Sequence, residues 1–96
     1  MNDKALYIEK IETELKEWKA EIELFKAKSL SATADAKISM NENIKVFEAK
    51  VEEAKVKLAE LVKSTENTFD AMRKTFEIKW EIIKTAVVDT TKKLNA

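Results

Sequence analysis

The sequence predicts an all-α fold, either a three-helix bundle or a closely related antiparallel helical coiled coil. The 96 residues include neither glycine nor proline, on which tight turns and hairpin loops depend, so a many-stranded β fold is disfavoured. Charged residues make up 38% of the chain, which is typical of long helices. Apolar residues at heptad spacing then divide one domain, residues 1–96, into helical segments at about 3–29, 36–63 and 66–94.

The first segment has a single apolar stripe along one side of the predicted helix. Charged residues separate the members of this stripe, which recur at steps of three and four: Ile8, Ile11, Leu15, Trp18, Ile22 and Phe25. Asn2 or Asp3 can cap the helix start, because a side-chain oxygen there accepts a hydrogen bond from a free amide N–H. We therefore expect an amphipathic helix whose stripe needs a covering partner.

The second segment follows a region, residues 29–36, in which the stripe contains only serine and alanine. A turn here is one alternative, since Ser39 and Glu42 match the capping-box pattern that starts many helices. A continuous helix is the other, since alanine has the highest helix propensity. Beyond this region the stripe resumes with residues that are larger except at Ala54: Met40, Ile44, Phe47, Val51, Ala54, Leu58 and Leu61.

The third segment begins after a better-marked reversal, between residues 58 and 69. Lys63 suits the end of a helix, and Ser64 or Thr65 can cap the start of the next. β-Branched residues lower the helix propensity after Ala86, although a strand there would have no partner. The main stripe of this segment consists of Phe69, Met72, Phe76, Trp80, Ile83, Val87 and Leu94.

The third segment also has a second apolar row. At about 100° per residue, Ala71, Thr75, Ile78 and Ile82 lie opposite the main stripe. A helix that is apolar on two faces is usually buried on both, so this row predicts an additional contact. Isoleucines scattered over the surface without a function are the alternative.

Two architectures would bury these apolar stripes. Two turns would produce a three-helix bundle within one chain. A single helix over residues 3–63 would instead be roughly 90 Å long and would leave half of its stripe exposed. An antiparallel dimer that exchanges the first segments would cover that stripe. We favour this segment-swapped dimer, because the central region contains no glycine or proline.

Composition argues against most chemical functions. The chain has no cysteine and no histidine, so it lacks the common nucleophile, the common general base and the usual transition-metal ligands. A di-iron site in a helical bundle would need histidine beside its carboxylates. The sequence also lacks a glycine-rich phosphate loop. We therefore expect no enzyme, no catalytic or metal-binding residue, no cofactor and no small-molecule substrate.

Charge and hydropathy restrict the partners and the location. The net charge is zero and is balanced along the chain, so nucleic acid is not expected as a partner. No apolar run approaches the ~18 residues of a membrane-spanning helix, and the polar start does not resemble a secretion signal. These features predict a cytoplasmic protein.

The remaining hypothesis is an interaction surface, through which the chain forms a homo-oligomer or binds a partner helix. Binding to a lipid or membrane surface is the alternative, because amphipathic helices flanked by lysine can lie on membranes, although the acidic residues here weaken it. Trp18 and Trp80 could then anchor in lipid, but core packing with an indole N–H reaching an acceptor is favoured. The candidate surface consists of Ile8, Ile11, Leu15, Trp18, Ile22, Phe25, Ile78 and Ile82.

The sequence also resembles a family of small bacterial coiled-coil proteins, loosely described as apolipoprotein-like, some of which are linked to stress responses. The resemblance covers most of the chain, in stretches that include Leu15-Lys-Glu-Trp18, Ala34-Asp-Ala-Lys37, Leu58-Ala-Glu-Leu61 and Glu77-x-x-Trp80. The resemblance implies a non-enzymatic helical protein and assigns no catalytic role to any residue of this sequence. Residues 29–33 depart from the alanine-, glutamate- and lysine-rich run expected of such proteins.

Overall fold

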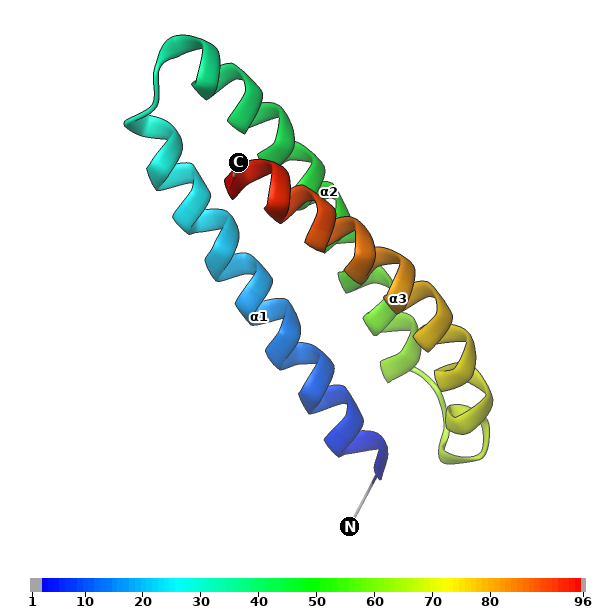
Figure 1. Ribbon diagram of the computed structural model, residues 1–96. Helices are drawn as coiled ribbons and strands as arrows, with labels where there is room; N and C mark the ends of the chain where they lie inside the picture. Colours follow the sequence, from blue (N-terminus) through cyan, green and yellow to red (C-terminus); the bar gives the residue numbers. More distant parts are fainter. Residues whose placement is uncertain (1–2, 96) are drawn as a thin grey trace.

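The computed structural model describes residues 3–95, which form three helices. These are α1 (Asp3–Leu30), α2 (Ala34–Val62) and α3 (Glu66–Asn95), and they run up, down and up in a rod of 53 × 21 × 17 Å (Figure 1). No strand occurs among the described residues, so the predicted all-α three-helix architecture is confirmed. The helix bounds lie within two residues of those expected, and the proposed cap at Asn2 falls outside the described residues.

A turn over residues 31–33 separates α1 from α2, so these are two helices and not one continuous helix. Thr33 caps α2, with its Oγ1 accepting a hydrogen bond from the Ala36 N–H at 3.4 Å. The predicted capping box at Ser39 and Glu42 is wrong, because both residues lie inside α2. Thr33 starts the helix earlier, and the alanines that follow favour its continuation.

The reversal between α2 and α3 was predicted correctly. The Ser64 hydroxyl is buried and donates to the Leu61 carbonyl at 2.6 Å, and the Ser64 N–H donates to the same carbonyl at 3.0 Å, so this acceptor at the end of α2 is satisfied. Thr65 and Thr68 form a reciprocal cap, in which the N–H of each donates to the Oγ1 of the other, at 3.0 and 3.3 Å. The Lys4 ammonium of α1 also donates to the Ser64 carbonyl, which ties the start of α1 to this turn.

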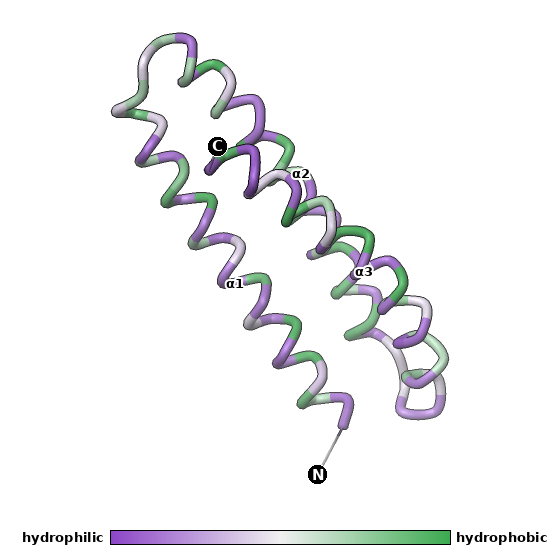
Figure 2. Tube along the Cα trace, in the orientation of Figure 1, coloured by the Kyte–Doolittle hydropathy of each residue, from purple (hydrophilic) through white to green (hydrophobic). Residues whose placement is uncertain are grey.

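The core follows the predicted stripes, which are visible as the repeated hydrophobic segments in Figure 2. Phe47 and Ala54 of α2 are fully buried, and α2 lies close to both of the other helices. Met72 is the exception in α3, since it is 37% exposed at the edge of the core. Thr90 occupies the stripe between Val87 and Leu94, and its hydroxyl is satisfied by the Ala86 carbonyl at 2.9 Å.

Aromatic side chains fill the space between α1 and α3, whose backbones approach each other at fewer points than either approaches α2. Trp18 stacks on Trp80 with 5.0 Å between ring centroids. Tyr7 packs edge-on against Phe69 and Phe76, at 6.0 and 6.1 Å. These large rings hold α1 away from α3 while burying the surface between them.

The Trp80 indole N–H donates to a Glu14 carboxylate oxygen at 2.8 Å, at the rim of the core. This confirms for Trp80 the expected combination of core packing and a polar contact at the rim. Near the turn between α1 and α2, the buried Ser29 hydroxyl donates to the Asn41 side-chain oxygen at 2.8 Å, which joins these two helices.

Candidate interaction surface

The structure separates the predicted interaction residues into two groups. The first group lies on α1, where α2 and α3 cover it, and consists of Ile8, Ile11, Leu15, Trp18, Ile22 and Phe25. All of these residues are buried in the core except Ile8, which is half-buried. The turn over residues 31–33 brings this stripe back onto its own chain, so it is not an accessible surface in the folded protein. Ile78 and Ile82 are 67% and 65% exposed and remain at the surface.

The exposed isoleucines belong to a row on the outer side of α3. We define this outer row as Ala71, Thr75, Ile78 and Ile82, all of which are exposed. Their steps of four, three and four match the a and d positions of a heptad. The opposite face of α3 is buried against the core, so α3 has two apolar faces and only one of them is covered within the chain.

Charged residues border the outer row. Exposed Lys74 and Glu81 lie on the side away from α2, and exposed Lys79 lies on the side of α2. The seven ion pairs of the described residues involve none of these three side chains. Their charges are therefore directed to solvent and available to a partner.

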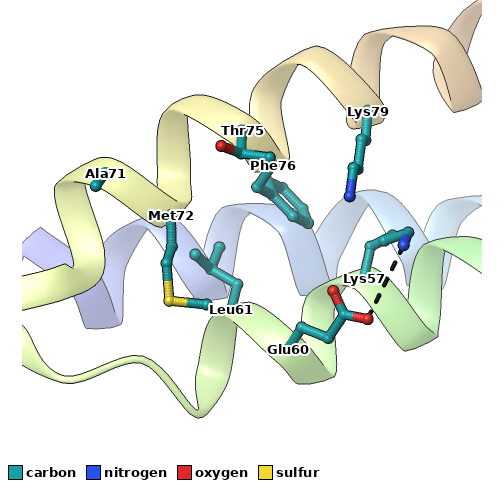
Figure 3. Close-up of a pocket in the computed structure, with 8 residues that line it drawn as sticks. All are labelled: Lys57, Glu60, Leu61, Ala71, Met72, Thr75, Phe76 and Lys79. Carbon is teal, nitrogen blue, oxygen red and sulfur yellow. Dashed lines mark ion pairs between the residues drawn. The ribbon is translucent and has the colours of Figure 1, made fainter.

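A groove of about 290 Å³ runs along the side of the outer row that faces α2 (Figure 3). Met72 and Leu61 lie near one end, and the ammonium groups of Lys57 and Lys79 lie near the other. Lys57 pairs with Glu60 at 3.9 Å across one turn of α2. The sequence does not reveal this groove, because its shape depends on how α2 and α3 are aligned. Its lining consists of Lys57, Glu60, Leu61, Ala71, Met72, Thr75, Phe76 and Lys79.

A second cluster, which the sequence analysis missed, connects α1 to α3 around the only arginine. The Arg73 guanidinium lies over the rings of Tyr7 and Phe69, at 5.8 and 5.6 Å from their centroids. It also pairs with Asp70 and Glu77, each at 3.8 Å. The spacing of Arg73 and Glu77 indicates their pairing, but nothing in the sequence places Tyr7 beside them. The cluster stabilises the start of α1 against α3.

Titration of Tyr7 provides a test of this cluster. Burial, followed by the negative charge of Glu77, raises the pKa of Tyr7 from 10.0 to about 12. The pKa of Tyr7 is higher in the folded protein than in the unfolded chain. Its contribution to the free energy of unfolding is therefore complete below pH ~10 and is lost as the pH rises through about 12. Tyr7 is the only tyrosine, so its ionisation can be followed directly by ultraviolet absorbance.

The matched variant for this titration is Glu77→Gln, which removes the carboxylate charge and leaves the burial of Tyr7 unchanged. The pKa of Tyr7 is expected to fall in this variant but to stay above its ordinary value, since burial is the larger cause. An ordinary pKa for Tyr7 in the unsubstituted protein would contradict the packing described.

The described residues contain no group of three or more His, Cys, Asp or Glu side chains positioned to hold a metal ion. None of α1, α2 and α3, over the residues that the structure describes, is long and apolar enough to cross a membrane. No protein family matches the chain, and no curated protein or solved structure matches it significantly. The resemblance to small bacterial coiled-coil proteins therefore stays a prediction.

Proposed function

We propose that this protein is a non-enzymatic interaction module, which binds another helix, from a second copy or from a partner, through the outer row of α3. The exposure of Ile78 and Ile82 on one face of α3 is the observation that carries the proposal. They are one helical turn apart, so they form one contact surface. Their helix is already buried on its opposite face, and helices that are apolar on two faces usually bury both.

The setting of the outer row distinguishes it from Leu30 and Ile38, two of the most exposed apolar residues elsewhere in the bundle. Leu30 and Ile38 are also exposed, but they lie near the turn between α1 and α2, and neither of them lines the groove beside the outer row. Single exposed apolar residues are common on soluble proteins. The outer row instead adjoins the groove beside Met72, which widens the apolar surface available to a helix.

The test combines Ile78→Glu with Ile82→Glu. We expect the double variant to lose association, because two charges would have to be buried at the contact. Helicity should be unchanged, since both positions are exposed and surface substitutions usually alter stability by less than ~0.5 kcal/mol each. Light scattering over a range of concentrations measures the mass, and circular dichroism measures the helicity.

The control is Ile38→Glu combined with Val56→Glu, which adds the same charge at exposed positions of α2. This control should associate as the unsubstituted chain does. An unchanged mass in the Ile78/Ile82 variant would contradict the proposal, and it is also the result expected of a dimer formed only by exchange of α1. A mass of 11.0 kDa at every concentration of the unsubstituted chain would contradict self-association.

Binding to a lipid surface is the second candidate, because Lys74 and Lys79 border the outer row and would face anionic headgroups. Glu81 borders it too and opposes that attraction, which is why we favour a helix. Co-sedimentation with anionic vesicles at low salt separates the two candidates. Sedimentation that disappears in the Ile78/Ile82 variant would support lipid binding, and no sedimentation at low salt would contradict it.

A further inference from the structure

We infer that the outer row of α3 binds the outer row of a second copy of this chain, with the two α3 helices antiparallel and Lys74 of each beside Glu81 of the other. The inference rests on the proposed function and adds the identity, direction and register of the partner helix. The sizes and charges of the side chains that would meet across the contact determine this arrangement.

Side-chain size favours self-pairing. The outer row has two small residues toward its start, Ala71 and Thr75, and two large ones toward its end, Ile78 and Ile82. In an antiparallel pair centred between residues 76 and 77, each Ile78 faces Thr75 of the other copy, and each Ile82 faces Ala71. Large residues therefore meet small ones at every layer, which is how helix interfaces pack closely. A two-fold axis makes each of these contacts occur twice.

The same register joins opposite charges. Lys74 of one copy and Glu81 of the other lie on the same side of the contact, with an axial offset of about 3 Å at 1.5 Å per residue. Neither has an ion-pair partner among the described residues of its own chain. On the other side, Lys79 of one copy lies over Met72 of the other, beside Glu60 in the groove. Its aliphatic stem would pack on Met72 while its ammonium reaches toward Glu60.

Other arrangements of the same surfaces place like charges together. A parallel pair would bring Lys74 of one copy beside Lys79 of the other, because flanking heptad positions five residues apart meet in parallel coiled coils. An antiparallel pair shifted by one heptad would place Glu81 beside Glu81 and Lys79 beside Lys79. Charge therefore selects the direction and the register that size already favours.

The contact leaves the rest of each bundle unchanged. The outer row faces away from the core, so α1 and α2 of the two copies lie on opposite sides of the α3 pair. Only one helix and the edge of one groove contribute from each copy, so the interface is small. We expect a reversible dimer whose population depends on concentration.

Charge exchange tests the register. Lys74→Glu alone and Glu81→Lys alone each replace two attractions by two repulsions, so each should raise the dissociation constant about tenfold, or ~1.4 kcal/mol. The combined variant K74E/E81K restores both pairs and should return to within about twofold of the original value. Sedimentation equilibrium measures the dissociation constants, and Lys16→Glu, on the exposed face of α1, is the control with the same charge change as Lys74→Glu.

A spin label tests the direction, which is possible because the chain has no native cysteine. In the antiparallel register, labels on the two copies of the Asp89→Cys variant lie about 38 Å apart along the helices, whereas a parallel pair would place them within ~15 Å. A distance within ~15 Å between the two labels would overturn this inference. So would a dissociation constant that stays unchanged in Lys74→Glu alone and in Glu81→Lys alone. If association were nevertheless lost in the Ile78/Ile82 variant, the proposed function would stand without this partner geometry.

Discussion

Replacing Phe47 with alanine is expected to lower the free energy of unfolding by about 3–5 kcal/mol, which is a large part of the stability of a small domain. Phe47 is fully buried in α2, the helix that lies close to both α1 and α3. Removing its ring would leave a cavity that three packed helices cannot close without moving, so lost burial and lost packing add together. Urea unfolding followed by circular dichroism measures the change.

The neighbouring residue provides a matched control for this prediction. Val46 precedes Phe47 on the same helix but is 47% exposed, so Val46→Ala should change the free energy of unfolding by less than about 0.5 kcal/mol. Similar losses in the two variants would show that the bundle does not pack around Phe47 in solution. A loss below about 1 kcal/mol for Phe47→Ala would lead to the same conclusion.

The second large effect is expected at Trp80, where α3 meets α1. Trp80→Ala should lower the free energy of unfolding by ~3–5 kcal/mol, because it removes a large buried side chain. The stack on Trp18 at 5.0 Å is lost as well. Since the chain has only two tryptophans, any coupling between their indoles in the circular dichroism spectrum should also disappear.

The variant Trp80→Phe separates packing from hydrogen bonding at this position. Phenylalanine keeps an aromatic ring between Trp18 and Phe76 but cannot donate to Glu14, which accepts from the indole at 2.8 Å. We expect a smaller loss, of about 1–2 kcal/mol, for the missing hydrogen bond and the smaller ring. Equal losses for alanine and phenylalanine would contradict the aromatic contact between α1 and α3.

The helices could be predicted from the sequence because their apolar residues repeat with the period of a helix. Spacing alone placed Ile44 and Leu61 in the core, and both are buried. The turn over residues 31–33 was harder to predict, because it contains no glycine or proline and alanines follow it. Thr33 was the available signal, since its side chain caps α2, but Ser39 matched a stronger capping pattern.

The candidate site could be predicted only in part. The pattern of α3 indicates that Ile78 and Ile82 lie away from the core, and the structure shows them exposed. The same periodicity cannot tell whether the stripe of α1 is covered by its own chain or by another, because that depends on the turn. The contacts of Tyr7 with Arg73 and of Lys4 with Ser64 also cross between helices, and helical spacing carries no information about them.

The order in which the helices meet has a kinetic consequence. α2 follows α1 and precedes α3 through turns of three residues each, and its contacts with these sequence neighbours dominate the bundle. Short loops cost little closure entropy, and chains rich in local contacts fold within microseconds to milliseconds. The absence of proline also removes the isomerisation that delays refolding in many proteins. We therefore expect the chain to refold rapidly and without a slow phase, which limits the time during which its apolar stripes are exposed and could aggregate.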